Sequence, residues 1–470
     1  MRKFILFCLI VLYSICLSAQ IDTLWTRHYG GSNYDWSNIV METQDNYYLM
    51  GGSTNYVSGE GDLYIVKTTS NGDTVWSRAY GGSDNDVCMD IIETSDGHYL
   101  LAGTTKSFGA GSQDIWILKC DSTGDTLWTN TFGGSNYDTG VSIIETNDNN
   151  YLFSARTSDP MGMFAGWLVK LNTDGDTLWT QAYDYDDSGS FSDVIQADST
   201  NYIAVGFKDD TVIGNVNFWL IKVDSSGNVL WNKNYGDSDD ETLDKIIRTD
   251  DNYYIAVGDM YDYSNESYDL FAMKINTDGD TLWTGQYGGP YDERCGDISP
   301  TSDGGYLIGS YAQYDSIGSR DALIIKIDSL GNEEWSKYYG GDQSDGCYSV
   351  CKTSNGFYLF AGYSYSYTNG QCDAWLIKAY ETSSGITFES NLQSHYSVRQ
   401  VDNKSILLQM PAKTSINIKL FDVTGRIISN NTRILNAGTQ LIPIDSKPGV
   451  YFVNIESEFG ELYGKFIHIN

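Results

Sequence analysis

Residues 22–31 read Asp22-Thr23-Leu24-Trp25-Thr26-Arg27-His28-Tyr29-Gly30-Gly31, and variants of this stretch recur along most of the chain. The shared pattern is a Trp, an aromatic residue four positions later and, in most copies, Gly-Gly. The later copies are 51 or 52 residues apart and are centred on Trp76, Trp128, Trp179, Trp231, Trp283 and Trp335. A period this regular indicates one supersecondary unit copied along the chain, each copy burying its apolar face against its neighbours.

Each unit contains four predicted strands. In the second unit three segments, 87–94, 98–104 and 114–120, precede the Trp segment 125–132 and are joined by short turns rich in Asp and Gly. Four antiparallel strands in about 52 residues are typical of a propeller blade. The composition agrees, because 48 Gly and 36 Tyr with 6 Pro favour short strands and tight turns over helices.

Counting the units predicts seven blades. Their innermost strands begin near Trp36, Val87, Thr139, Ser190, Thr242, Arg294 and Gly346. No Trp segment follows the third strand of the seventh unit, which ends at Ala379, whereas residues 22–31 are a spare copy before the first unit. Pairing the two would close the ring and leave no open edge. We therefore predict an all-β fold, a seven-bladed β-propeller of four-stranded blades over residues 20–380, closed by the N-terminal strand.

The first residues have the three parts of a secretory signal peptide. A basic start, Met1-Arg2-Lys3, precedes an apolar run over residues 4–17 and the small-residue site Ser18-Ala19-Gln20. We predict a signal peptide over residues 1–19, cleaved after Ala19. The run is too short for a membrane span, and no later stretch is apolar enough for one, so we expect no transmembrane segment in the mature chain.

The charge balance excludes some partners. Lys and Arg total 29 against 62 Asp and Glu, which gives a net charge of −33. Such a chain repels phosphate backbones and anionic lipid headgroups, so we expect no nucleic-acid partner. Divalent cations, basic peptides and neutral sugars remain compatible.

The repeat ends before the C-terminus. Residues 381–394 lack the pattern and are predicted to be a linker. Residues 395–470 alternate apolar and polar side chains between Gly and Asn turns, which predicts a small β-sandwich.

This last segment carries a family resemblance. Residues 418–428 begin Ile418-Lys419-Leu420-Phe421-Asp422, and Asn436-Ala437-Gly438, residues 448–453 and Lys465 follow. Together they resemble the type A C-terminal sorting domain of the type IX secretion system, although the family's usual Pro-Asn-Pro is absent and Met410-Pro411 is its nearest equivalent. The resemblance implies a Bacteroidota-type protein exported by the type IX machinery through residues 395–470, then released or held at the outer cell surface. Repeat propellers are common among such passengers, which implies a fold and no activity.

Residues present in every unit are explained by the blade, so function is expected where the units differ or where like residues form a ring. A lysine recurs in all seven third strands and is expected to serve packing or a repeated ion pair; the seven are Lys67, Lys119, Lys170, Lys222, Lys274, Lys326 and Lys378.

Six carboxylates each lie six residues beyond the aromatic residue of the preceding Trp segment, and Gly189 takes the seventh place. They are Asp35, Asp86, Asp138, Glu241, Glu293 and Asp345. We expect them at the rim of the central channel on one face. A ring of like charges there would raise pKa values or recruit a cation such as calcium, and apart from calcium we expect no cofactor. The alternative, which the close match to the repeat favours, is that each carboxylate accepts backbone N–H bonds from its own Gly-Gly turn.

The loops between second and third strands differ between units and are predicted to lie on the same face. They are rich in Tyr, Ser, Gly and Asn, a mixture typical of binding surfaces and suited to sugars or peptides. The alternative is that these are ordinary polar loops of a secreted protein. The aromatic candidates for ligand contact are Tyr56, Phe108, Phe164, Tyr261, Tyr263 and Tyr365.

Enzyme signatures are scarce. The predicted propeller holds His28 and His98 alone, so a histidine triad or zinc site is not expected, and no P-loop or nucleophile elbow is present. We predict a secreted or cell-surface propeller that acts as a binding or adhesion module rather than an enzyme. The alternative is a carbohydrate-active enzyme, a glycosidase or lyase, that uses the rim carboxylates, because two acids at the right separation suffice for that chemistry.

Overall fold

A computed structural model describes most of the chain. The described residues are 20–54, 61–159, 161–209, 214–236, 240–263, 266–313, 319–368, 371–382, 397–402, 405–410, 413–422, 426–436, 438–443, 449–457 and 460–468. The predicted signal peptide and most of the predicted linker lie outside them. The described helix content is a single 3-10 turn, Tyr185–Asp187, and no described helix is long and apolar enough to cross a membrane.

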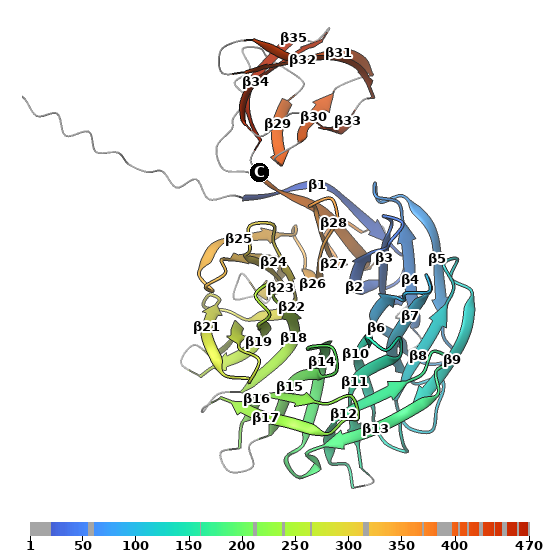
Figure 1. Ribbon diagram of the computed structural model, residues 1–470. Coiled ribbons are helices and arrows are strands. Elements are labelled where there is room, and N and C mark those ends of the chain that lie inside the picture. Colours follow the sequence, from blue (N-terminus) through green and yellow to red (C-terminus); the bar gives the residue numbers. More distant parts are fainter. Residues whose placement is uncertain are drawn as a thin grey trace, which may run out of the picture. The chain divides into compact units, whose positions relative to one another are not determined.

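Seven four-stranded sheets surround a central channel (Figure 1). Blade 1 comprises β2 (Trp36–Glu42), β3 (Tyr48–Thr54), β4 (Asp62–Thr68) and β5 (Thr74–Tyr80). Blade 2 comprises β6 (Asp86–Glu93), β7 (Tyr99–Thr105), β8 (Asp114–Cys120) and β9 (Thr126–Phe132). Blade 3 comprises β10 (Thr139–Glu145), β11 (Tyr151–Ser158), β12 (Phe164–Leu171) and β13 (Thr177–Tyr183).

The next three blades repeat this order from innermost to outermost strand. Blade 4 comprises β14 (Gly189–Gln196), β15 (Tyr202–Asp209), β16 (Val216–Val223) and β17 (Val229–Tyr235). Blade 5 comprises β18 (Glu241–Arg248), β19 (Tyr254–Asp262), β20 (Ser267–Ile275) and β21 (Thr281–Tyr287). Blade 6 comprises β22 (Glu293–Pro300), β23 (Tyr306–Gln313), β24 (Arg320–Ile327) and β25 (Glu333–Tyr339).

Blade 7 closes the ring with a strand from the other end of the repeat region. Its sheet runs from β26 (Asp345–Lys352) through β27 (Tyr358–Ser364) and β28 (Asp373–Thr382) to β1 (Gln20–Tyr29). Figure 1 shows β1, drawn in blue, alongside β28. The predicted closure by the N-terminal strand is therefore confirmed.

The core lies between the blades and is built from the two middle strands of each sheet. All seven residues of β7 and of β8 are buried, whereas β9 alternates exposed and half-buried positions. Fully burying one aliphatic side chain contributes about 1.5–3 kcal/mol, so these middle strands supply most of the hydrophobic stabilisation. The outer strands alternate because one face covers the neighbouring blade and the other meets solvent.

In most outer strands the Trp, the Tyr or both donate a hydrogen bond to the hairpin turn of the next blade. The Trp179 indole donates to the carbonyl of Ser225 at 3.0 Å, and the Tyr183 hydroxyl donates to that of Gly227 at 2.8 Å. The same tyrosine bond joins Tyr29 to Gly72 and Tyr287 to Gly331. The Trp pattern therefore recurs because it joins consecutive blades.

The repeated lysine forms an ion pair in six blades. Lys170 donates to Asp148 at 2.5 Å and to the hydroxyl of Tyr202, in the next blade, at 2.9 Å. The equivalent pairs are Lys67–Asp45, Lys119–Asp96, Lys222–Asp198, Lys274–Asp251 and Lys326–Asp303. This confirms the predicted structural role, with Lys378 as the exception.

The C-terminal part contains two antiparallel sheets. The first joins β29 (Ser397–Asp402), β30 (Ser405–Met410) and β33 (Gly438–Pro443). The second has the order β32 (Ile427–Leu435), β31 (Thr414–Asp422), β34 (Gly449–Ser457) and β35 (Gly460–His468). Ile416, Ile418 and Leu420 alternate along β31 and are buried, as the alternating pattern predicts.

Candidate functional site

The six predicted rim carboxylates are buried, and five of them accept a backbone N–H from their own turn. Asp345 accepts the N–H of Gly341 at 2.9 Å and the hydroxyl of Ser366 at 2.6 Å. The same backbone bond to the second turn glycine is made by Asp35 to Gly31, Asp86 to Gly82, Asp138 to Gly134 and Glu293 to Gly289. Glu241 is buried at the equivalent position beside Gly236. The turn-binding interpretation is therefore the one the geometry supports, and the described residues contain no group of three or more His, Cys, Asp and Glu that could hold a metal ion.

A second carboxylate, which was not predicted from the sequence, lies beside the same turn glycine as the first. In the turn before blade 6 the two are Asp269 of β20 and Glu293 of β22. A Cβ on Gly288 would lie 2.5 Å from Glu293 Oε2 and 2.6 Å from Asp269 Oδ1, so both oxygens crowd the glycine. Burial, with the nearby negative charges of Asp269 and Asp292, raises the pKa of Glu293 to about 7. These acids explain why a glycine recurs at this place, since any side chain would collide with them.

The junction between blades 3 and 4 lacks both acids and the turn glycine. Ala165 and Gly189 take the places of the two acids, and the Trp219 ring fills the space, because a Cβ on Gly189 would lie 2.6 Å from it. Asp184 stands where the other turns have glycine, and it pairs with Lys208 at 3.5 Å. The acids and the glycine are lost together, which supports a structural role for them.

Acidic side chains on the innermost strands also serve to join blades. Asp90 accepts the N–H of Ile143 at 2.9 Å, and Asp193 accepts that of Ile246 at 2.9 Å. Each bond connects one blade to the next. Lys245 lies 3.8 Å from Asp193 and partly balances this charge.

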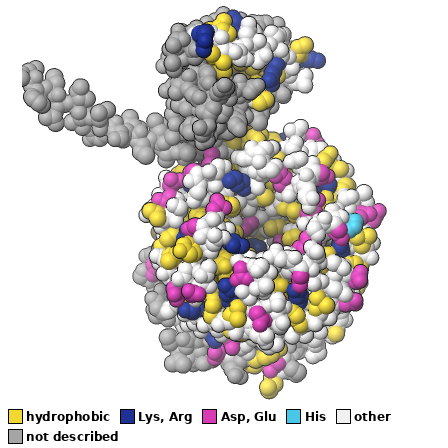
Figure 2. Space-filling model, viewed as in Figure 1, with side chains coloured by type: hydrophobic (Ala, Val, Ile, Leu, Met, Phe, Trp, Pro, Cys, Tyr) yellow, Lys and Arg dark blue, Asp and Glu magenta, His cyan; other side chains and the backbone are white. Residues whose placement is uncertain are grey.

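A cavity lies at one mouth of the channel. It has a volume of about 890 Å³ and is lined from blades 6, 7, 1 and 2 by Trp36, Asn38, Val87, Met89, Ser319, Arg320, Asp342, Gln343, Ser344, Tyr348, Tyr363, Tyr365 and Cys372. We call it the mouth pocket. Figure 2 shows the ring hollowed at its centre, with acidic and basic side chains spread over the face in view rather than gathered in one patch.

β-Bulges place three of the lining side chains. Every innermost strand shifts its register by one residue, and the extra residue in β2, β6 and β26 is Asn38, Met89 and Tyr348. A bulge re-aims the side chain that it carries, so these residues leave the blade packing and line the pocket. Asn38 also donates to the carbonyl of Cys88 at 2.8 Å, which joins blade 1 to blade 2.

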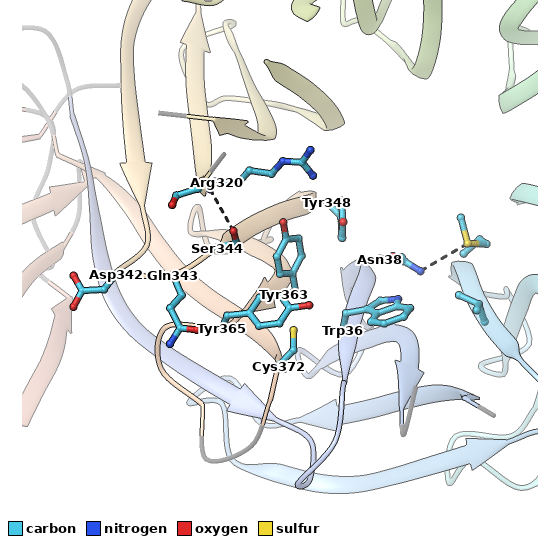
Figure 3. A pocket seen from close by; sticks show the side chains of 13 residues that line it. Trp36, Asn38, Arg320, Asp342, Gln343, Ser344, Tyr348, Tyr363, Tyr365 and Cys372 are labelled. Carbon is cyan, nitrogen blue, oxygen red and sulfur yellow. Dashed lines mark hydrogen bonds between the residues drawn. The ribbon is translucent and has the colours of Figure 1, made fainter. Parts of the chain in front are cut away.

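One wall of the mouth pocket is a row of tyrosines. The ring centroids are 5.4 Å apart for Tyr348 and Tyr363, 5.8 Å for Tyr363 and Tyr365, and 6.2 Å for Tyr365 and Tyr34. Figure 3 shows Tyr365 directed toward Trp36, with Tyr363 beside Tyr365. Burial raises the pKa of Tyr363 and of Tyr365 to about 12, so both hydroxyls stay protonated and can donate hydrogen bonds.

The charged groups of the pocket are few. The Arg320 guanidinium lies 5.1 Å above the Tyr311 ring, and no ion pair joins it to any acid in the described part of the chain. Among the described residues of the lining, Asp342 contributes the single carboxylate, and its side chain points in a different direction from that of Arg320 (Figure 3). The described lining therefore offers aromatic faces, protonated hydroxyls, amides and the Arg320 cation.

The predicted loop residues are largely elsewhere. Tyr365 lines the mouth pocket, but Phe108 packs on Trp116 at 5.3 Å, and Tyr261 and Tyr263 form a separate aromatic contact at 4.8 Å. Phe164 lies 3.4 Å below the Arg156 guanidinium, and Tyr56 is outside the described residues. Sequence reasoning missed Trp36, Tyr348 and Arg320. Their signal was present, since these positions vary among the units.

Comparison with known proteins identifies the C-terminal part. Residues 402–470 match the family described as the secretion system C-terminal sorting domain. The regulatory protein FlaEY of Caulobacter vibrioides is 25% identical over 180 residues, which is 33% of this chain and 19% of that protein. The chain thus spans about a fifth of the length of this relative.

Among solved structures, puromycin hydrolase aligns with 90% of this chain and 58% of its own, at 11% identity and a TM-score of 0.48. Sqt1 from Chaetomium thermophilum aligns with 83% of this chain and 97% of its own, at 9% identity and a TM-score of 0.45. Likenesses this distant say nothing about activity. The chain is therefore a seven-bladed β-propeller that carries a type IX secretion C-terminal sorting domain, which points to export to the cell exterior or outer surface.

Proposed function

We propose that this protein is an exported binding module whose propeller holds a saccharide in the mouth pocket. The observation that carries the proposal is the lining, which combines Trp36 and a row of tyrosines with Asn38, Gln343 and the Arg320 cation. Sugar rings offer apolar faces for stacking and hydroxyls for hydrogen bonds, and both kinds of partner are provided here. A predicted signal peptide over residues 1–19 would start the export that the sorting domain completes.

The pocket favours binding over hydrolysis. A glycosidase of the usual kind needs two carboxyl groups flanking the scissile bond. Asp342 is the one acid among the described lining residues, while Asp35, Asp86 and Asp345 are buried in their turns. The carbohydrate-active enzyme that the rim carboxylates suggested therefore gains no support from their geometry.

Titration calorimetry with soluble oligosaccharides of several linkages tests the proposal. We expect Trp36→Ala to weaken binding by at least about tenfold, equivalent to about 1.4 kcal/mol, because it removes a stacking face. Phe108→Ala, which changes an aromatic residue in the loop between β7 and β8 that is not part of the pocket lining, should bind as the wild type does. Failure of every oligosaccharide to bind, equal binding by both variants, or release of shorter products during the titration would contradict the proposal.

A further inference from the structure

A second cavity lies at the outer edge of the ring, where the strand that closes blade 7 meets blade 6. It has a volume of about 350 Å³, and we call it the edge pocket. It is lined by Thr23, Thr26 and His28 of β1, Tyr338 and Tyr339 of β25, Gly340, Tyr367, and Trp375 and Ile377 of β28.

Aromatic rings form the walls of the edge pocket. The His28 ring stacks on Trp375 with centroids 6.1 Å apart and planes 7° apart, and Tyr367 lies 6.4 Å from Trp375. Tyr338 is 49% exposed and Tyr367 is 53% exposed, so ring surface is open to solvent. Exposed aromatic surface of this kind is typical of sites that stack a ligand.

The repeat does not require these aromatic residues. His28 and Tyr338 hold the position just before the conserved outer-strand aromatic residue, and both of them line the edge pocket. The other five outer strands carry small or polar residues there, namely Ala79, Thr131, Ala182, Asn234 and Gln286. Two large rings at this position in adjacent outer strands therefore set the seam between blades 6 and 7 apart from the other junctions.

The edge pocket adjoins the mouth pocket. Gly340 and Tyr367 line the edge pocket, while Asp342 and Tyr365, two residues away along the chain, line the mouth pocket. Two residues span at most about 7 Å, so two short chain segments link the lining of one pocket to that of the other. The Tyr367 hydroxyl donates to the carbonyl of Gly340 at 2.7 Å, and Ser366 donates to that of Gln343 at 3.1 Å, which holds the two segments together.

A buried polar atom is available in the edge pocket. His28 Nε2 has no hydrogen-bond partner among the described residues. Burial lowers the pKa of His28, so the ring is neutral at physiological pH. A neutral imidazole has one donor and one acceptor nitrogen, so it can form a hydrogen bond with a hydroxyl group.

We propose that the edge pocket is a second subsite for the ligand of the mouth pocket, and that this ligand is a saccharide chain long enough to occupy both. The inference rests on the proposed function and adds the ligand's length and direction: it runs from the channel mouth outward over the seam between blades 6 and 7. Stacking at both ends, at Trp36 and at Tyr338, would hold separate sugar residues of one chain.

The test measures affinity against chain length, from disaccharide to hexasaccharide, for the linkage that binds best. We expect wild-type affinity to rise by about tenfold or more over this series. Tyr338→Ala should remove that gain and leave disaccharide affinity unchanged, whereas Trp36→Ala should weaken binding at every length. Asn234→Ala, at the same strand position in blade 4, is the matched control and should change nothing.

The possible failures are distinguishable. Tight binding that does not depend on length, or a Tyr338→Ala variant that keeps the full gain, would overturn the second subsite and leave the proposed function intact. Absence of any oligosaccharide binding would overturn both. Circular dichroism of each variant confirms that its fold is unchanged, as expected for an exposed tyrosine.

Discussion

Among the seven repeated lysines, Lys378 is the one without an ion pair to an aspartate in the first hairpin of its blade, within the described residues. Asn355 stands where the other blades have an aspartate, and its amide keeps the turn bond to Thr353 at 2.7 Å but offers no charge. Lys378 is 4% exposed, donates to the carbonyl of Ser70 at 3.2 Å and lies 4.4 Å from the Phe357 ring centre. Burial lowers its pKa from 10.5 to about 8. The junction that closes the ring therefore carries a weakly solvated ammonium group.

Asn355→Asp should stabilise the propeller by about 1–2 kcal/mol, because it restores a charge-assisted bond to a buried lysine. In the wild type, the unfolded chain binds a proton at Lys378 between pH 8 and 10.5 that the folded chain does not, so wild-type stability rises with pH in this window. The gain from the aspartate should accordingly be largest below pH 8 and should shrink toward pH 10.5.

Chemical denaturation of both proteins across this pH range measures the difference. Asp148→Asn, which removes the acid paired with Lys170 in blade 3, is the reciprocal control and should destabilise. A gain that does not change with pH would mean that Lys378 is not the group responsible.

At the scale of elements, the hairpin between the third and fourth strands of each blade serves two purposes. It turns the chain, and it receives the Trp of the preceding blade. Gly124 is restricted in two ways. Its φ of 84° lies in the left-handed region, and a Cβ placed on it would lie 3.2 Å from the Trp76 ring and 2.8 Å from the Arg78 side chain. Gly97, in the hairpin between the first and second strands, has a similar φ of 79° and open space around its Cβ position.

Gly124→Ala should therefore cost more stability than Gly97→Ala. Both substitutions impose a left-handed conformation on alanine, at a cost of about 1–2 kcal/mol. Gly124→Ala must in addition displace the Trp76 ring, and we expect a total loss of about 2–4 kcal/mol. Thermal denaturation of the two variants is the measurement, and equal losses would show that the Trp contact does not depend on this glycine.

The element scale also explains the mouth pocket. In a regular strand every second side chain takes part in the packing between blades. A bulge adds one residue to the strand, and this extra residue is outside that alternation. Because each innermost strand carries one extra residue, the ring has seven positions that the blades do not need for packing. Three of them, Asn38, Met89 and Tyr348, line the mouth pocket.

At the scale of the whole molecule, ring closure is the feature that joins distant parts of the sequence. The Val40 N–H donates to the Ser349 hydroxyl at 3.2 Å, and the Asp35 N–H donates to the Cys372 carbonyl at 2.9 Å. These bonds join blade 1 to blade 7. They act together with β1, which covers the outer edge of β28.

Deleting the mature chain up to Gly31 should destabilise the propeller strongly, because it exposes an unpaired edge at β28 and removes the buried Tyr29. Deleting residues from Gly385 onward should leave the propeller folded, since its blades end before that position. Melting curves of the two truncated proteins decide the matter. Similar transition temperatures for both would contradict closure by the N-terminal strand.

The sequence by itself determined the blade number, the four strands of each blade, the closing strand and the sorting domain. These follow from local patterns, because a period of 51 or 52 residues, alternating apolar side chains and Asp-Gly turns are each contained within one unit. It also determined that an acid six residues beyond each outer-strand aromatic belongs to the repeat. The second acid beside the turn glycine, such as Asp269 beside Glu293, was not predicted from the sequence. The two acids come together only when two blades pack against each other.

Tertiary structure alone decided which of the non-repeated residues meet. Trp36, Arg320 and Tyr348 come from blades 1, 6 and 7 and share a pocket because the ring brings the first blade beside the last. His28 stacks on Trp375 because β1 joins a sheet whose other strands lie at the far end of the repeat. Contacts of this kind depend on ring closure and on the bulges of the innermost strands. The sequence around one residue of such a pair therefore does not predict which residue it will contact.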